Sequence, residues 1–358
     1  MESPARQNSS VTSAARQKAK RIAAAVLGAA LCVMSSAAAG DADAGASDAP
    51  GFDLARPEIA AFIDRVVARD GFARDQLTAA MAAAKVRPEL TAEMRHAPEK
   101  LLDWWQYRQR FVTPRRIENG VRFWREHQAD VESAASGSGV APEYLVAILG
   151  IETNYGEITG GYREIDTLMT YAFDYPERSR FFRSELRQFL LLARELGRDP
   201  LAIRGSYGGA LGVPQMMPSN YRRFAAGRPG GATVDLWTDW SAILTGLAEF
   251  LHRRGWVKDG PVLVDGHARD GVDVPAASHF ALDDTIATLR AKGVSIDIAL
   301  PGRTPVVLVP AALEHGIQYR VGFRNFYVIT RYNPRVNYAM AVCDLAQHIR
   351  NAFSEPQR

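Results

Sequence analysis

Glu152 is the first residue whose position suggests chemistry, because it stands where an apolar side chain is expected. Four residues at positions i, i+3, i+4 and i+7 form the stripe that a helix turns toward its core: Leu145, Ile148, Leu149 and Glu152. Glu152 lies in the last turn of this helix, where the helix dipole does not stabilise a negative charge. Burial without a partner raises the pKa of a carboxyl, so Glu152 could keep a proton near neutral pH and donate it to a leaving group.

A second interpretation of Glu152 is structural. Buried carboxylates often form an ion pair with an arginine, and Arg178 and Arg204 are candidates for such a partner. The helix that carries Glu152 does not decide between a proton donor and a paired anion.

A glycine-rich segment, RGSYGGALGVPQMMPSNYRRFA, could bring backbone close to a ligand. Within it, Ser206 and Gln215 offer uncharged donors and acceptors of the kind that hold a sugar hydroxyl or amide. A tight structural turn before a helix that begins at Pro218 would have the same composition. The segment lacks the G-x-x-x-x-G-K-[ST] pattern of a phosphate loop.

The segment FYVITRYNPRVNYAMAV combines tyrosine and asparagine, which suit carbohydrate because a ring face can stack on a sugar and an amide can bond its hydroxyls. Alternation over residues 326–330 predicts a strand that Pro334 ends. Tyr332 and Asn333 would then lie at the strand end and Tyr338 at the start of the next helix. An Asn-Pro turn with half-buried tyrosines is the alternative.

Together, GIETNYG, GSYGGALGVPQMMPSNY and YVITRYNPRVNYAMAV resemble the membrane-bound lytic murein transglycosylase B family, glycoside hydrolase family 103. The resemblance runs from about Trp104, through YRQRFVTPRRIENGVRFW, to Cys343. It implies a mainly α (α+β) protein with a goose-lysozyme-like helical core, an added N-terminal helical domain and a small β domain. It also implies an enzyme that acts on peptidoglycan and needs no cofactor.

The resemblance assigns roles residue by residue. It implies that Glu152 is the single general acid/base and that Ser206 holds the N-acetyl group or the catalytic region of the substrate. Further substrate-binding residues match by motif or by neighbouring sequence: Gln215, Tyr332, Asn333, Tyr338, Tyr107 and Arg178. Two residues depart from the family pattern, since Met216 replaces a frequent Phe in a sugar subsite and Glu177 stands where a second Arg is expected.

Substrate-assisted glycosidases dispense with a second carboxylate, and the resemblance implies such a mechanism here. Glu152 would protonate the oxygen between N-acetylmuramic acid and N-acetylglucosamine, and the 6-hydroxyl of the muramic acid would close a 1,6-anhydro ring. One alternative is a hydrolytic lysozyme, for which Asp166 or Glu157 would be the second carboxylate. Another is a peptidoglycan-binding scaffold without catalysis.

Residues 1–39 have the order of a secretory signal peptide: basic residues at 16–21, an apolar run at 22–34 and a small-residue site at 37–39. Cys32 fits a lipid anchor poorly, because Leu31 precedes it and the apolar run continues. We therefore expect a periplasmic protein without a lipid anchor. Removal of residues 1–39 changes the formal net charge from +3 to −1, so the basic pI does not indicate a nucleic-acid partner.

Apolar periodicity and turn residues divide the remaining chain. We expect a flexible leader at 40–51, an N-terminal helical domain at 52–135 that ends near a Ser-Gly linker at 136–139, and a lysozyme-like catalytic core at 136–256. A small β domain at 257–330 and a groove segment with a C-terminal helix at 331–358 follow. The resemblance leaves room for penicillin-binding proteins or other cell-wall enzymes as partners.

No metal site is predicted, because the seven histidines show no H-E-x-x-H or clustered ligand spacing. Many members of the family carry a calcium loop before the segment DLW. Residues 227–234 occupy that place here and contain no carboxylate or side-chain amide, whereas calcium takes about six to eight oxygen ligands.

We therefore predict that calcium does not stabilise this protein. Its melting temperature should be the same with millimolar calcium and with a chelator, because an ion that does not bind the native state cannot shift unfolding. Differential scanning calorimetry of the mature chain checks this, and a rise in melting temperature with calcium would contradict it.

Overall fold

The computed structural model describes residues 49–96, 102–226, 234–269 and 281–355. The expectations for the signal peptide, for most of the leader and for the loop at 227–233 lie outside these residues. The described residues form two hydrophobic cores, a large one shared by the helices and a small one inside a β domain. The chain is thus mainly helical with a small sheet, as the sequence predicts.

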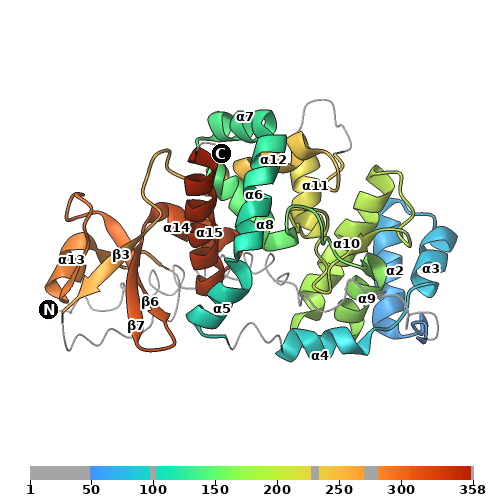
Figure 1. Ribbon diagram of the computed structural model, residues 1–358. Coiled ribbons are helices and arrows are strands. Elements are labelled where there is room, and N and C mark those ends of the chain that lie inside the picture. Colours follow the sequence, from blue (N-terminus) through green and yellow to red (C-terminus); the bar gives the residue numbers. More distant parts are fainter. Residues whose placement is uncertain (1–48, 97–101, 227–233, 270–280, 356–358) are drawn as a thin grey trace, which may run out of the picture.

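The N-terminal helices lie at one end of the molecule (Figure 1). They are α2 (Pro57–Asp70), α3 (Arg74–Ala82) and α4 (Pro88–His96). Gly71 ends α2 with a φ of 67°, a left-handed conformation that glycine adopts at little cost. The apolar face of α2 packs against α10 (Ser179–Glu195), and α4 packs against α9 (Glu164–Asp174). The short helix η2 (Pro176–Arg178) joins α9 to α10.

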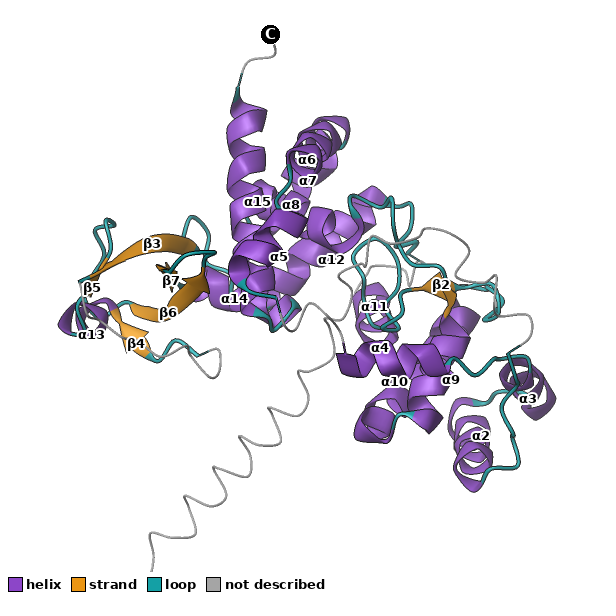
Figure 2. Cartoon of the chain, turned by 60° about the horizontal axis from the view of Figure 1, so that its bottom comes forward, coloured by secondary structure: helices purple, strands orange, loops and turns teal. Residues whose placement is uncertain are grey.

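A second group of helices surrounds α8 in the middle of the molecule (Figures 1 and 2). It consists of α5 (Trp104–Phe111), α6 (Pro114–Glu126), α7 (Gln128–Ser138), α8 (Pro142–Thr153), α12 (Trp240–Arg253), α14 (Arg324–Tyr332) and α15 (Val336–Ser354). The last helix, α15, packs against α5, α6 and α8. Nearly every residue of α8 is buried, so this helix is the axis of the group.

A short two-stranded ribbon and one further helix connect the two groups. Strand β1 (Tyr162–Arg163) pairs antiparallel with β2 (Arg204–Gly205), and α11 (Pro218–Ala226) packs against α10. The glycine-rich loop runs from β2 to α11. It therefore begins on a ribbon that leads into α9 and ends on a helix that packs on α10.

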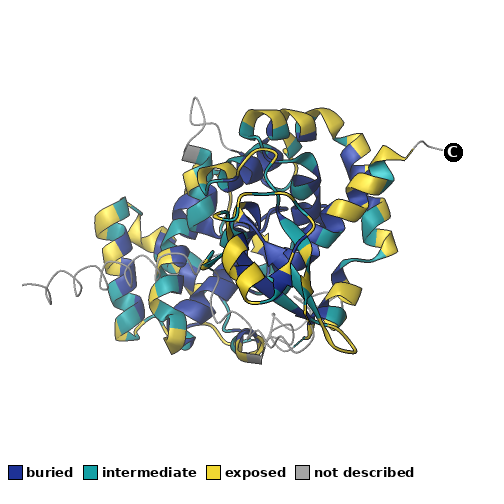
Figure 3. Cartoon of the chain, turned by 90° about the vertical axis from the view of Figure 1, so that its left-hand side faces the viewer, coloured by how far each residue is buried: buried dark blue, intermediate teal, exposed yellow. Residues whose placement is uncertain are grey.

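The β domain is a five-stranded antiparallel sheet with the order β4-β6-β7-β3-β5. Its elements are β3 (Leu263–Ala268), β4 (Asp284–Thr285), α13 (Ile286–Ala291), β5 (Val294–Ser295), β6 (Pro305–Ala312) and β7 (Ile317–Gly322). Leu308 of β6 pairs with Val321 of β7, and both side chains enter the small core with Val306 and Phe323. The exposed colours of Figure 3 gather on the outer surfaces of the domains, and the buried colour on their inner faces.

The predicted strand at 326–330 is wrong, because these residues belong to α14. The alternating apolar residues are buried on several sides of this helix, which contacts β7, α12 and α15. A short apolar run that is buried on all sides has no period that separates a strand from a helix. The expected linker is also wrong in part, since 136–138 form the last turn of α7 and only Gly139, with a φ of 74°, leaves the helix.

The predicted boundary at residue 135 stays a proposal. Helices α5 and α6 lie before it in sequence and pack on α15 and α8, which lie after it. In the described ranges, no single helix is long and apolar enough to cross a membrane, and α7 and α8 reach that length only together, with a bend of 116° between them.

Candidate active site

Glu152 is buried in the last turn of α8, as its place at the end of an apolar stripe predicts. Pro142 starts this helix at its first position, and Asn154 ends it in a left-handed conformation with a φ of 50°. Glu152 is 5% exposed. The side chain is therefore withdrawn from water although it carries an ionisable group.

The carboxyl of Glu152 has one polar partner among the described residues. The hydroxyl of Tyr338, in the first turn of α15, donates a hydrogen bond of 2.6 Å to Glu152 Oε1. Burial raises the pKa of Glu152 to about 8, and the bond from Tyr338 offsets part of this rise. Glu152 is therefore protonated at neutral pH and can donate a proton.

The structure does not pair Glu152 with an arginine. Arg204 donates instead to the carbonyl of Gly161, at 2.9 Å, and the guanidinium of Arg178 lies 4.5 Å from the ring centroid of Phe181. Within the described part of the chain, no ion pair involves Glu152. The structural interpretation that the sequence left open is therefore not supported.

Three tyrosines from different helices meet beside Glu152. Tyr107 of α5 and Tyr332 of α14 lie close enough to Tyr338 to raise the pKa of its phenol, although burial is the main cause and the charge of Glu152 the next. Tyr332 donates to the carbonyl of Pro214 in the glycine-rich loop. The three predicted tyrosines thus lie at one site, although they are up to 231 positions apart in the sequence.

The glycine-rich loop is both a tight turn and a wall of this site. Ser206 is buried, and its hydroxyl accepts a bond of 3.1 Å from the amide of Ala210. Gln215 has a φ of 49°, and its side-chain amide donates to the carbonyls of Thr159 and Gly212 at 3.0 and 2.9 Å. Both interpretations of the loop are therefore compatible, because its polar side chains fix its own backbone.

One side chain of α8 holds this loop. Thr153 follows Glu152 directly, and its hydroxyl donates to the carbonyl of Val213 at 3.0 Å. Because Pro214 also accepts the bond from Tyr332, the loop is anchored on both α8 and α14. A shift of the loop would therefore displace the end of α8 that carries Glu152.

The contacts of three other residues singled out in the sequence do not include the Glu152 carboxyl. Asn333 is buried and accepts a bond from the amide of Arg335 at 3.2 Å, which shapes the turn into α15. Met216 lines a small cavity of about 60 Å³ between α11 and α12, next to Phe224 and Phe250. Glu177, the other departure from the family pattern, forms an exposed ion pair of 3.2 Å with Arg95.

The candidates for a second catalytic carboxylate are engaged elsewhere. Both oxygens of Asp166 accept bonds from Arg163, at 2.9 and 3.0 Å, and Oδ1 also accepts from the amide of Lys85. Glu157 accepts a bond from the side chain of Asn154, outside the helix. In the described residues neither carboxylate contacts Glu152.

Sequence reasoning missed a second buried carboxyl, Glu164. It is fully buried at the start of α9, and neither of its oxygens has a hydrogen-bond partner in the described residues. Burial raises its pKa well above the usual value, and the nearby Glu185 raises it further. The signal was present, because Glu164, Leu168 and Tyr171 form an i, i+4, i+7 stripe like that of Glu152.

Glu164 lies beneath the glycine-rich loop. A Cβ on Gly205 would stand 2.1 Å from Glu164 Oε2, and one on Gly209 would stand 3.4 Å from Oε1. Gly205 is therefore required so that the backbone can approach this neutral carboxyl, whereas a Cβ on Gly209 would meet Leu168 Cδ2 at 2.8 Å.

A helical core that buries one protonated carboxyl beside a cluster of tyrosines offers the kind of group that glycosidases use as a general acid. The sequence matches the family described as Transglycosylase SLT domain over residues 55–347. It is 36% identical over 302 residues to the membrane-bound lytic murein transglycosylase B of Escherichia coli (strain K12), with 82% of each chain covered. The chain belongs to this transglycosylase family.

Solved structures agree with this assignment. The soluble lytic transglycosylase SltB1 of Pseudomonas aeruginosa has 37% identity and a TM-score of 0.75, with 83% of this chain and 99% of that chain covered. The Escherichia coli lytic transglycosylase Slt35, solved in complex with bulgecin A, has 34% identity and a TM-score of 0.77, with 86% and 97% covered. The predicted fold class is confirmed.

The turn that ends α8 is held by Tyr155, whose side chain lies between α6 and α8. Tyr155 follows Asn154 with a φ of 63°, and its hydroxyl donates to the carbonyl of Arg116 on α6 at 2.8 Å. A Cβ on Gly120 of α6 or on Gly150 of α8 would stand 2.5 Å from this hydroxyl. Two glycines thus leave room for the side chain that holds the turn after Glu152.

We predict that Gly150→Ala destabilises the protein by about 1–3 kcal/mol, because its Cβ would displace Tyr155. In an open helix the same substitution is stabilising by about 0.5–1 kcal/mol. The matched control is Gly137→Ala in α7, where a Cβ would meet nothing within 4 Å. Urea unfolding of both variants checks this, and equal stabilities would show that Tyr155 does not need the space.

We predict that Glu164→Gln changes the pH dependence of stability. The native carboxyl keeps its proton while the unfolded chain loses its proton near the model value of 4.5, so wild-type stability falls as pH rises above that value. The variant should match wild type near pH 4 and melt at a higher temperature at pH 8. Exposed Glu126→Gln is the control, and a variant that melts at the wild-type temperature at pH 8 would contradict burial of the neutral carboxyl.

Proposed function

We propose that this protein is a lytic transglycosylase that cleaves the bond between N-acetylmuramic acid and N-acetylglucosamine in peptidoglycan and leaves 1,6-anhydro ends. The observation that carries the proposal is the buried, protonated Glu152 with Tyr338 as its donor and no second carboxylate in contact among the described residues. Membership of the transglycosylase family, and the murein named for the Escherichia coli relative, support the substrate.

Glu152 would act twice in the reaction. Its proton passes to the glycosidic oxygen as the bond from the anomeric carbon to that oxygen breaks, while the N-acetyl oxygen of the same sugar assists at the anomeric carbon. The ionised Glu152 then removes the proton of the 6-hydroxyl, and the 6-oxygen bonds to the anomeric carbon as the N-acetyl oxygen leaves it. The proton returns to Glu152, so no water is consumed and the enzyme is restored.

Tyr338 would connect the two halves of this cycle. Its hydroxyl can donate to Glu152 both before and after the proton is transferred, and a donor stabilises the anion more than the acid. Burial raises the pKa of Glu152, which keeps its proton in place at neutral pH, and the bond from Tyr338 limits this rise in pKa. The 6-hydroxyl belongs to the bound substrate, so cyclisation benefits from a large effective molarity when water is excluded.

The remaining predicted residues would hold the sugars. We propose that Ser206 and Gln215 position the substrate through the loop whose backbone they fix, and that Tyr107, Tyr332 and Asn333 form the groove around the scissile bond. Arg178 and Met216 would affect neighbouring subsites. No cofactor enters any step of this mechanism.

A hydrolytic reaction on the same fold is the weaker candidate. It would need a carboxylate to activate water, and Asp166 is held by Arg163 while Glu157 bonds Asn154 outside the helix. We also propose export to the periplasm, supported by the order of charge, apolar run and small residues in 1–39. Penicillin-binding proteins and other cell-wall enzymes stay proposals as partners.

We predict that Glu152→Gln folds normally and loses on the order of a hundred-fold or more in rate, because the amide keeps the shape but cannot donate the proton. The rate of the wild-type enzyme should fall as pH rises through the pKa of Glu152, about 8, since the acid form is the active one. The exposed Glu126→Gln serves as control. A fully active Gln variant would show that Glu152 is structural.

The products distinguish transglycosylation from hydrolysis. Digestion of purified sacculi in heavy-oxygen water should release muropeptides with unlabelled 1,6-anhydro ends, one water lighter than the hydrolytic products. Mass spectrometry of the digest checks this. If the heavy oxygen enters the reducing end, the enzyme is a lysozyme.

A further inference from the structure

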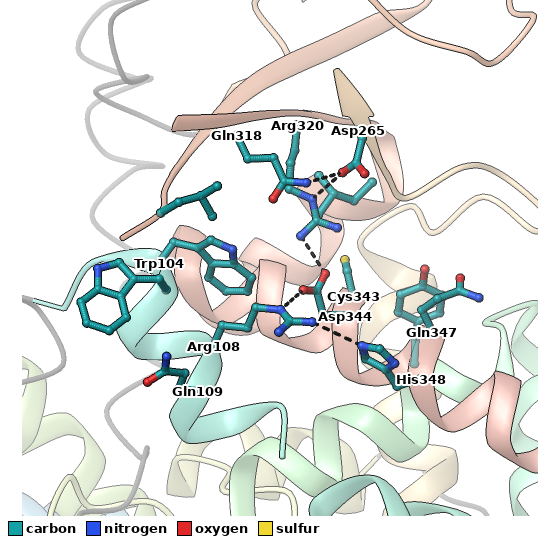
Figure 4. A pocket seen from close by; sticks show the side chains of 14 residues that line it. Trp104, Arg108, Gln109, Asp265, Gln318, Arg320, Cys343, Asp344, Gln347 and His348 are labelled. Carbon is teal, nitrogen blue, oxygen red and sulfur yellow. Dashed lines mark hydrogen bonds and ion pairs between the residues drawn. The ribbon is translucent and has the colours of Figure 1, made fainter. Parts of the chain in front are cut away.

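A cavity outside the catalytic site lies between the β domain, α5 and α15 (Figure 4). Its volume is about 540 Å³, within the range of about 300–1,000 Å³ typical of ligand sites. Its lining includes aromatic residues, neutral amides, paired charges and two leucines, Leu263 of β3 and Leu313 at the β6–β7 turn. None of the residues assigned to catalysis lines this cavity.

The paired charges form one wall, and they are arranged as a chain. Asp344 of α15 accepts from Arg108 at 3.0 Å and from Arg320 at 2.7 Å. Arg320 lies 3.5 Å from Asp265 of β3, which also accepts a bond of 3.1 Å from Gln318. Two arginines and two aspartates cancel, so the wall is dense in donors and acceptors but carries no net charge.

This wall is largely buried at Asp344 and Arg320 and exposed at Asp265. The side chains of Asp344 and Arg320 are 13% and 12% exposed, whereas that of Asp265 is 61% exposed. Asp265 uses only Oδ1 in its contacts with described residues, which leaves Oδ2 available as an acceptor. The Nε of Arg320 is buried without a hydrogen bond in the described part of the chain.

Helices α5 and α15 also supply flat apolar surface and amides. Trp105 is half-buried beside Trp104, whose indole belongs to the core. Gln109 lies one turn farther along α5 and Gln347 on α15 (Figure 4). An aromatic face together with uncharged amides and a neutral network of charges suits a ligand with apolar ring faces and many hydroxyl or amide groups.

Helices α5 and α15, which line the cavity, also carry Tyr107 and Tyr338. Tyr107 and Trp105 are two residues apart on α5, and Tyr338 and Gln347 are nine apart on α15. With about 3.6 residues per turn, each pair points to nearly opposite sides of its helix. A ligand in the cavity would therefore not occupy the catalytic groove, although the same two helices hold both sites.

We propose that this cavity is a second carbohydrate site that binds uncharged N-acetylhexosamine units. The identity of the ligand as a peptidoglycan glycan rests on the proposed function. A glycan strand bound in this cavity would keep the enzyme on the insoluble polymer while the catalytic groove releases its products. An anionic ligand is disfavoured because the wall offers no net positive charge.

Titration of the mature Glu152→Gln protein with chitopentaose, followed by nuclear magnetic resonance of the indole N–H groups, tests the proposal without any turnover. The Trp105 signal, assigned by its loss in Trp105→Phe, should move in a saturable way. Asp265→Ala should weaken this response about tenfold. The control is Asp64→Ala, an aspartate of equal exposure (62%) paired with Arg74 on α3, and its response should equal that of the parent.

A Trp105 signal that does not move, or that moves equally in Asp265→Ala, would overturn the proposal. A response to a free stem peptide but not to chitopentaose would show that the ligand class is wrong. The matching functional measurement compares Trp105→Ala with wild type: binding to sacculi should fall, whereas the rate on short soluble glycans should be unchanged. Failure of the proposed function can be told apart from failure of this proposal, because it would give hydrolytic products or no products while the Trp105 signal still moves.

Discussion

The hydroxyl of Tyr338 reaches from α15 to the carboxyl of Glu152 on α8, and this bond of 2.6 Å lies inside the protein. Burial keeps this carboxylic acid neutral at pH 7, and the bond from Tyr338 limits the rise in its pKa so that it can still give up its proton. The surrounding structure maintains this balance. If water reached Glu152 its pKa would fall toward the ordinary value, and if Tyr338 withdrew the anion would lose its donor.

Maintaining that environment has a cost in stability. A carboxyl that must remain protonated in the native state disfavours folding as the pH rises, and here Glu152 and Glu164 both do so. The core compensates through α8, which is buried along nearly its whole length against α6, α7, α12 and α15. The two carboxyls also differ in use. Glu152 has a donor in Tyr338 and lies next to the anchor of the glycine-rich loop, whereas Glu164 lies beneath Gly205 of this loop.

Much of the site could be read from local pattern, because a helix repeats every few residues and Glu152 interrupts an apolar stripe. The same reasoning could have found Glu164. It failed at 326–330, where burial on several sides of α14 removed the period that separates a helix from a strand. It could not show that Arg178 lies against Phe181, that Asp166 is held by Arg163 or how the five strands are ordered. These features depend on contacts between distant segments, which leave no mark in the spacing of either one.

Tyr338 and Glu152 are 186 residues apart, and α15 is the last helix of the described chain. Contacts over such a separation form late, because a long loop must close before they contribute any free energy. During synthesis, the chain through α14 already carries Glu152 and the loop but has no donor for the carboxyl. The carboxyl of Glu152 thus gains its donor only when α15 docks on α8. Loss of α15 would leave most of the core sequence present and remove the donor to Glu152.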